Sequence, residues 1–127
     1  MRGQGRLLWV MTALELLAGF SLLLVPGIAL DALLGNGAAP AAETLAVSRL
    51  AGVALIAIGV MAHSGSHGGP NWWLLAGLLV YNAGAAAVLS FIGAGLGLAG
   101  PLLWPAAILH AGLTFWTLIS LRYLASP

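Results

Sequence analysis

Four polar side chains stand out because each lies inside a long apolar segment of the chain: Glu15, Arg49, Asn82 and His110. A carboxylate and a guanidinium can form an ion pair, or the carboxylate can bind a cation or carry a proton. An amide both donates and accepts hydrogen bonds, and a neutral imidazole can ligate a metal or a tetrapyrrole. These residue types point to a structural polar cluster, a transport path or a pigment site.

The segments that must position these residues are 7–25, 44–62, 72–92 and 102–121. Each holds about 20 residues, which at 1.5 Å rise is enough to cross a ~30 Å hydrocarbon core. The 127-residue chain is 61 % hydrophobic and 6 % charged, with a mean hydropathy of +1.07. Soluble domains are about 25 % charged. The sequence therefore predicts a single all-α domain that is a bundle of four transmembrane helices.

The arginines predict the orientation of this bundle. With four spans, Arg2, Arg6 and Arg122 share one side that has no acidic residue, whereas Asp31 and Glu43 share the other side. Because cytoplasmic loops carry an excess of Lys and Arg, both termini are expected in the cytoplasm. The net charge of +1 and the scattered arginines give no basic patch for nucleic acid.

Glycine, proline and asparagine predict where the helices end. Pro26 should break or kink the first span, and a short helical piece should follow it and stop at 35–37. Asn71 is a suitable N-cap for the third span. The glycine-rich segment 93–100 is expected to leave the helix, and Pro101 and Pro105 fit the first turn of the fourth span.

The polar residues are predicted to meet inside the bundle. Counted from the cytoplasmic end, Glu15, Arg49, Asn82 and His110 lie at heights of roughly 12, 20, 17 and 21 Å. One side chain from each helix in the same middle slab favours an interior cluster over exposure to lipid. Thr114 lies one turn after His110 on the same helix face and adds a hydroxyl to this set.

Two interpretations of Glu15 follow from its surroundings. Because Arg49 is expected within reach, we predict a structural ion pair that holds the first two helices in register. The alternative is a proton-coupling or cation-binding carboxylate, which would line a path together with Asn82 and His110.

Histidine also allows two interpretations. We expect His110 to be hydrogen-bonded to Asn82 or a threonine, with no cofactor. The alternative is an axial ligand to haem or a chlorophyll-type pigment. His63 and His67 have the i, i+4 spacing of a helical metal pair, but Gly65 and the neighbouring serines predict a loop there and no metal site.

Three segments together resemble a known group of proteins. The first span ends L-L-V-P-G, the second reads S-R-L-A-G-V-A-L-I-A-I-G, and the fourth reads L-L-W-P-A-A-I-L-H-A-G-L. This plan is similar to the small bacterial four-helix membrane proteins of the DoxX-like kind over most of the chain. The resemblance implies a location in the bacterial inner membrane and carries over no catalytic residue.

The function predicted from these observations is that of a non-enzymatic small integral membrane protein. It would self-associate or serve as an accessory subunit of a larger membrane complex, using the lipid bilayer, its own copies or other membrane subunits as partners. The close-approach sites would be Gly77 with Gly84, and Gly93 with Gly97. The alternatives are a small transporter or channel through Glu15, Asn82 and His110, and a haem- or pigment-binding subunit through His110.

Overall fold

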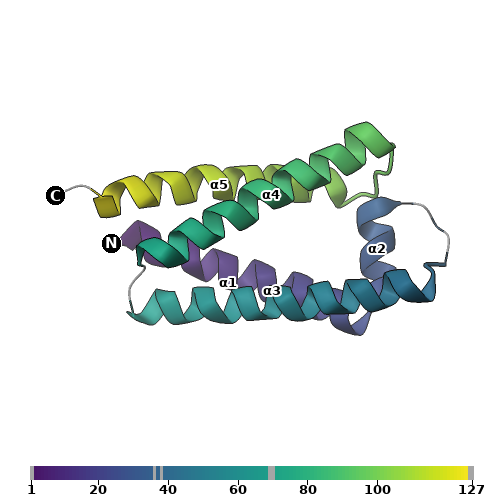
Figure 1. Cartoon of the computed structure of the whole chain (residues 1–127), viewed down its shortest axis with the longest axis horizontal. Coiled ribbons are helices and arrows are strands. Elements are labelled where there is room, and N and C mark those ends of the chain that lie inside the picture. Colours follow the sequence, from purple (N-terminus) through teal and green to yellow (C-terminus); the bar gives the residue numbers. More distant parts are fainter. Residues whose placement is uncertain (1, 36, 38, 69–70, 126–127) are drawn as a thin grey trace.

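The protein is built from helices throughout the part that its structure, a computed structural model, describes. The described residues are 2–35, 37, 39–68 and 71–125. They form four long helices and one short one, shown in Figure 1: α1 (Arg2–Leu24), α2 (Pro26–Leu34), α3 (Ala42–Gly68), α4 (Trp72–Leu96) and α5 (Leu103–Ala125). The four long helices are each long and apolar enough to cross a membrane. This confirms the predicted all-α bundle of four membrane-crossing helices.

The predicted kink and the N-cap of α4 are present. Val25 leaves the helical conformation between α1 and α2, and Pro26 occupies the first turn of α2, where its missing N–H costs nothing. The Asn71 side-chain oxygen accepts a hydrogen bond from the Leu74 N–H at 2.8 Å and caps α4. Gly35 ends α2 with a φ of 65°, a left-handed conformation that glycine adopts without strain. Asn36, Gly69 and Pro70, which the sequence places in turns, lie outside the described residues.

Two helices extend further than the sequence predicted. The α4 helix continues through Gly93 and Gly95 and ends only at Gly97, whose φ is 69°. The α3 helix continues through His63 and His67 to Gly68, so the loop predicted there is wrong. Gly65 lies close to the Leu74 side chain, which would have to shift to admit a β-carbon at this position.

The long helices form two antiparallel pairs, α1 with α3 and α4 with α5, and the contacts between the pairs are sparse. Glycines set the register of the first pair. A β-carbon on Gly19 would lie 2.8 Å from the Gly52 carbonyl oxygen, and one on Gly52 would lie 2.6 Å from the Gly19 carbonyl oxygen. The two backbones therefore touch directly, as small residues allow between membrane helices.

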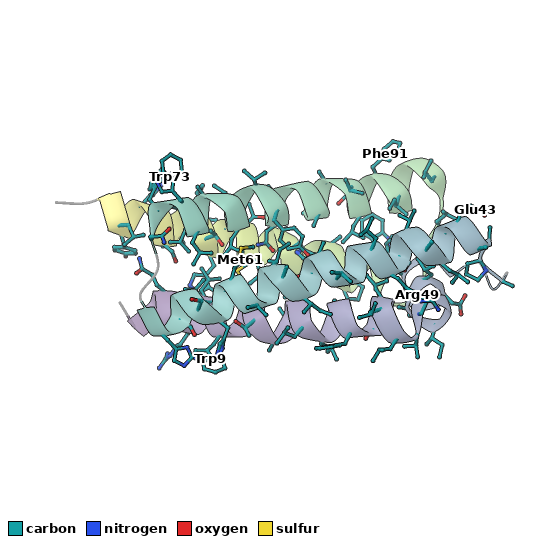
Figure 2. The ribbon with its side chains drawn as sticks, turned by 60° about the horizontal axis from the view of Figure 1, so that its bottom comes forward. Trp9, Glu43, Arg49, Met61, Trp73 and Phe91 are labelled. Carbon is teal, nitrogen blue, oxygen red and sulfur yellow. The ribbon has the colours of Figure 1, made fainter. Side chains whose placement is uncertain are left out.

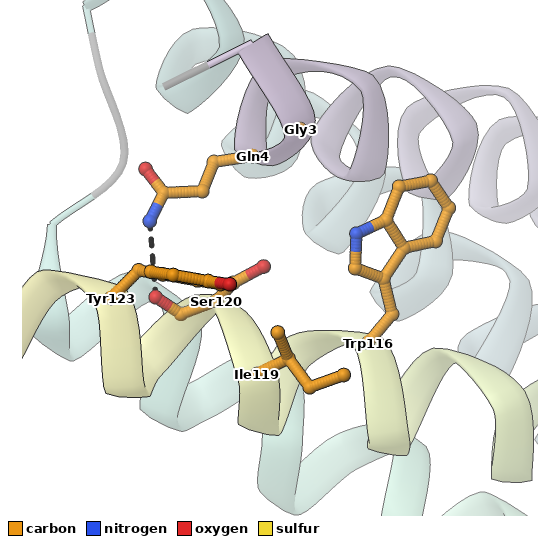
Figure 3. Close-up of a pocket in the computed structure, with 6 residues that line it drawn as sticks. All are labelled: Gly3, Gln4, Trp116, Ile119, Ser120 and Tyr123. Atoms are coloured by element: carbon orange, nitrogen blue, oxygen red, sulfur yellow. Dashed lines mark hydrogen bonds between the residues drawn. The ribbon is translucent and has the colours of Figure 1, made fainter.

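The packed core lies in the half of the bundle that holds both chain ends, which Figure 1 shows side by side. Its buried members come from all four long helices: Leu7, Leu8, Met11, Ala62, Leu75, Leu78, Leu113 and Leu121. Beyond this core, at the chain ends, the Gln4 side-chain amide donates to the Ser120 carbonyl oxygen at 3.0 Å (Figure 3). The bond lies beside a small cavity of about 200 Å³ and ties α1 to α5.

The opposite half of the bundle is closed by α2 rather than by a packed core. The turn before α5 docks on α2 through two backbone bonds, from the Gly100 N–H to the Leu33 carbonyl oxygen and from the Leu102 N–H to the Ala32 carbonyl oxygen, each 2.9 Å. Gly100 has no room for a side chain because a β-carbon would clash with the Ala32 carbonyl. The short helix thus joins the two pairs at this end while holding them apart.

Candidate functional site

Two side-chain hydrogen bonds bring three of the predicted polar residues into one region at mid-depth. The Tyr81 hydroxyl donates to Glu15 Oε2 at 2.7 Å and joins α4 to α1. His110 Nδ1 lies 2.8 Å from Asn82 Oδ1 and joins α5 to α4. The rings of Tyr81 and His110 meet edge to face, with centroids 5.6 Å apart. Glu15, Tyr81, Asn82 and His110 are called the polar cluster below.

The proton on His110 is assigned by its neighbour. The Asn82 Nδ2 group donates to the Leu78 carbonyl oxygen at 2.8 Å, which turns Asn82 Oδ1 toward the imidazole. A carbonyl oxygen can only accept, so His110 Nδ1 must carry the hydrogen. In the neutral ring, Nε2 is then a free acceptor. The predicted hydrogen bond between Asn82 and His110 is present, with His110 as the donor and Asn82 as the acceptor.

Glu15 is only 2 % exposed, and its partner is a tyrosine rather than an arginine. The predicted ion pair between Glu15 and Arg49 is therefore wrong. Arg49 is exposed, and Figure 2 shows it toward the end of α3 that carries Glu43. Among the described residues, no partner for the second carboxylate oxygen, Oε1, is seen.

The register of the first helix pair explains why Arg49 misses Glu15. Gly19 faces Gly52, and these two contacts fix the pair. Glu15 lies four residues from Gly19 toward the chain ends, whereas Arg49 lies three residues from Gly52 in the opposite direction. At 1.5 Å per residue, about 10 Å along the bundle separates the two charged residues. Close backbone packing outweighs the attraction of two charges.

Thr114 does not join the polar cluster. Its hydroxyl donates to the carbonyl oxygen of His110 in its own helix at 2.7 Å, so it offers nothing to the imidazole. Tyr81, in contrast, was missed by the sequence analysis because a tyrosine reads as part of an apolar run. A signal was present: Tyr81 precedes Asn82 in the middle of a span, and a phenol at that depth needs a hydrogen-bond partner.

A cavity of about 730 Å³ extends from the polar cluster toward α2. Glu15, Tyr81 and His110 line its inner end, and its walls are otherwise almost entirely aliphatic. Wall residues come from all five helices, including Ala18, Ala29, Leu55, Val88, Ala106 and Leu109. The cavity occupies the half of the bundle opposite the packed core. Its volume falls within the ~300–1,000 Å³ of small-molecule sites.

The other two histidines, His63 and His67, form a separate cluster outside the cavity. Because α3 continues to Gly68, His63 and His67 do have helical spacing, and their ring centroids lie 4.5 Å apart. Both rings pack edge-on against Trp9, at 5.1 and 5.6 Å. Across the part of the chain that the structure describes, no group of three or more His, Cys, Asp or Glu side chains lies close enough to hold a metal ion.

Comparison with known proteins adds no relative: no family model, curated protein or solved structure matches this chain. The fold alone therefore defines its class, a small α-helical integral membrane protein with four membrane-crossing helices. The polar cluster and its cavity are the features from which a function can be proposed.

Proposed function

We propose that the protein is a non-enzymatic membrane protein that binds a small amphiphilic molecule in its cavity, as a small transporter or carrier does. The observation that carries this proposal is the combination of aliphatic walls with a polar inner end at mid-depth. Binding sites for small molecules have this composition, with a few placed polar groups that fix the orientation of a mostly apolar ligand.

The uneven packing of the bundle supports transport rather than a purely structural role. One half is filled by the apolar core, and the other half contains the cavity. The two helix pairs have few contacts with each other. The hydrogen bonds that join them include Gln4 with Ser120, Glu15 with Tyr81, Asn82 with Met11, and α2 with the turn before α5. A rocking of one pair against the other would open the packed half and expose the same polar cluster from the other side.

The chemistry of the cavity favours binding over catalysis. The sequence contains no cysteine. Besides Tyr81, Ser21 contributes a hydroxyl to the lining, and this hydroxyl donates to the Leu17 carbonyl oxygen of its own helix at 2.8 Å. It is not aligned with His110 as a nucleophile would be.

A cavity-filling substitution tests the proposal. Ala106→Phe places a ring in the cavity, whereas Ala111→Phe, on the exposed face of the same helix, is the matched control. Both variants and the parent would be purified in nanodiscs from membranes, and bound small molecules would be extracted and identified by mass spectrometry. We expect a lipophilic molecule with the parent and with Ala111→Phe but not with Ala106→Phe. Equal recovery from all three proteins would contradict the proposal.

Self-association, or service as an accessory subunit, is the second candidate function, and one face of α4 favours it. Its exposed residues follow the 4–3 spacing of a helix–helix seam: Trp73, Gly77, Val80, Gly84, Ala87 and Phe91. We call this face the α4 seam. Figure 2 shows Trp73 and Phe91 projecting from its two ends. A β-carbon on Gly77 or Gly84 would meet nothing within 4 Å, so this face has room for a second helix.

The other predicted close-approach site is not available to a partner. Gly93 packs against the Leu103 and Trp104 side chains of its own chain, and Gly97 is the C-cap of α4. A test of self-association should therefore change the α4 seam. Gly84→Leu should lower the dimer fraction seen by native mass spectrometry, and Gly112→Leu, at an open glycine on α5, should leave it unchanged. A monomeric parent protein with no co-purifying subunit would remove this candidate.

We further propose a bacterial inner-membrane location with both termini in the cytoplasm. The support is the arginine asymmetry of the sequence and its resemblance to DoxX-like proteins. Reporters fused to the two termini should be active in their cytoplasmic form, and activity only outside the cytoplasm would contradict this topology.

A further inference from the structure

The inner end of the cavity presents hydrogen-bond acceptors. Because the Asn82 amide fixes the hydrogen of His110 on Nδ1, the neutral imidazole has a lone pair on Nε2, and no described side chain donates to it. Glu15 accepts from Tyr81 through Oε2, and its Oε1 has no donor among the described residues. The Tyr81 hydroxyl has already used its hydrogen on Glu15. A ligand that reaches this end therefore meets acceptors that need a donor.

When Glu15 is ionised, its charge has no counter-charge at this end among the described residues. Glu15 is the carboxylate of the cavity lining, and no lysine or arginine among the described residues lines it. Arg49, the cationic residue nearest to it along the first helix pair, is exposed and about 10 Å further along the bundle. A positively charged donor group on the ligand would supply both the missing hydrogen bonds and the missing counter-charge.

We infer that the cavity binds a hydrophobic ammonium compound, with its N–H groups on Glu15 Oε1 and His110 Nε2 and its apolar body along the aliphatic walls. This inference rests on the proposed function and names the class of its ligand. The Tyr81 ring lies at the same end, and an aromatic face adds a favourable interaction with a cation. The body of the ligand would fill the space toward α2, where Ala29, Leu33 and Val88 offer no polar partner.

Other ligand classes fit the same end less well. A carboxylate, a phosphate or a ketone would bring acceptors to face the acceptors of Glu15 and His110, and the buried groups would remain unsatisfied. An alcohol would satisfy one acceptor but would leave the carboxylate without a counter-charge. The structure therefore predicts how the affinities of three ligands with the same apolar body rank. The amine should bind most tightly, the alcohol less tightly and the ketone least.

Three biphenyl compounds test this order: biphenylmethylamine, biphenylmethanol and acetylbiphenyl. Their binding to the full-length protein in phosphatidylcholine nanodiscs would be measured by equilibrium dialysis, with empty nanodiscs to correct for partition into lipid. We expect saturable binding of the amine, at least about tenfold tighter than that of the alcohol. Saturable binding of all three compounds with equal affinity, abolished by Ala106→Phe, would overturn the ammonium inference and leave the proposed function intact.

Two glutamine variants test whether Glu15 is the residue that makes the amine bind more tightly than the alcohol. Glu15→Gln keeps an acceptor for Tyr81 but removes the charge, so it should weaken amine binding at least tenfold and change alcohol binding little. Glu43→Gln, at an exposed carboxylate in the first turn of α3, is the matched control and should bind like the parent. Unchanged amine affinity in Glu15→Gln, amine binding that survives Ala106→Phe, or no saturable binding of the amine would each overturn the inference.

Discussion

The Tyr81 hydroxyl donates to the Glu15 carboxylate at 2.7 Å, and this bond joins α4 to α1 across the middle of the bundle. It lies where the packed core ends and the cavity begins. The bond thus has two roles: it holds the two helix pairs together at mid-depth, and it orients the carboxylate that faces the cavity.

Removing the Tyr81 hydroxyl should weaken the fold. Tyr81→Phe leaves Glu15 buried without its donor, and side-chain hydrogen bonds between membrane helices contribute about 0.6 kcal/mol on average and up to about 1.7. We expect a loss of about 1 kcal/mol in the free energy of unfolding, measured by titration with denaturing detergent. Tyr123→Phe, at an exposed tyrosine on α5, is the control and should unfold like the parent. Equal stability of Tyr81→Phe and the parent would contradict the bond.

Glu15 and Arg49 should behave as independent residues. In this structure they lie about 10 Å apart along the bundle, and residues at such distances with no shared partner usually have additive effects. The double variant Glu15→Gln with Arg49→Leu should therefore lose the sum of the two single losses, within about 0.5 kcal/mol. A double variant that is more stable than the Arg49→Leu single variant would restore the ion pair that the sequence predicted.

Much of the architecture can be predicted from the sequence because it depends on local properties. The apolar runs locate four helices, Pro26 locates the break after the first, and Asn71 locates the start of α4. The contact between Asn82 and His110 was also predictable, since both lie at similar heights on consecutive spans with a short connection. In each case, the distance along one helix or hairpin decides the outcome.

The rest depends on how distant segments pack, which residue types alone do not specify. The opposite charges of Arg49 and Glu15 predict an ion pair, but the contact of Gly19 with Gly52 sets a helix register that separates the two residues. Tyr81 was missed because its hydroxyl gains a hydrogen-bond partner only when Glu15 of α1 lies beside α4. The cavity exists because α2 docks on the turn at Gly100 and holds the helix pairs apart, and no pattern within either segment indicates this contact.

The glycine contact of the first helix pair should be the least tolerant point in the bundle. A β-carbon at Gly52 would lie 2.6 Å from the Gly19 carbonyl oxygen, and backbone cannot move aside as a flexible side chain does. Gly52→Ala should therefore cost about 1–3 kcal/mol, as overpacked cores do. Gly77→Ala, on the open α4 seam, should be neutral or stabilising because alanine favours helix. Detergent unfolding of both variants would test this, and equal effects would contradict the register.

The last prediction concerns the bond between His110 and Asn82, and it distinguishes a hydrogen-bonding role of His110 from a pigment-binding role. His110→Gln retains a donor for Asn82 Oδ1, whereas His110→Leu leaves this buried oxygen without one, at a cost of about 1–3 kcal/mol. We therefore expect His110→Gln to keep most of the stability and His110→Leu to lose it, with His63→Gln, at an exposed histidine, as the control. Unfolding titrations would measure these differences.

The absorption spectrum separates the two roles further. Nε2 of His110 faces a ligand in either case, but an ammonium compound gives no visible absorption, so we expect the purified parent protein to be colourless. A Soret or bacteriochlorophyll band that disappears in His110→Gln would instead make His110 an axial ligand, because glutamine cannot replace imidazole in that position. Equal destabilisation by glutamine and leucine would show that the ring contributes by its shape, and the tautomer assigned from Asn82 would then lose its main experimental support.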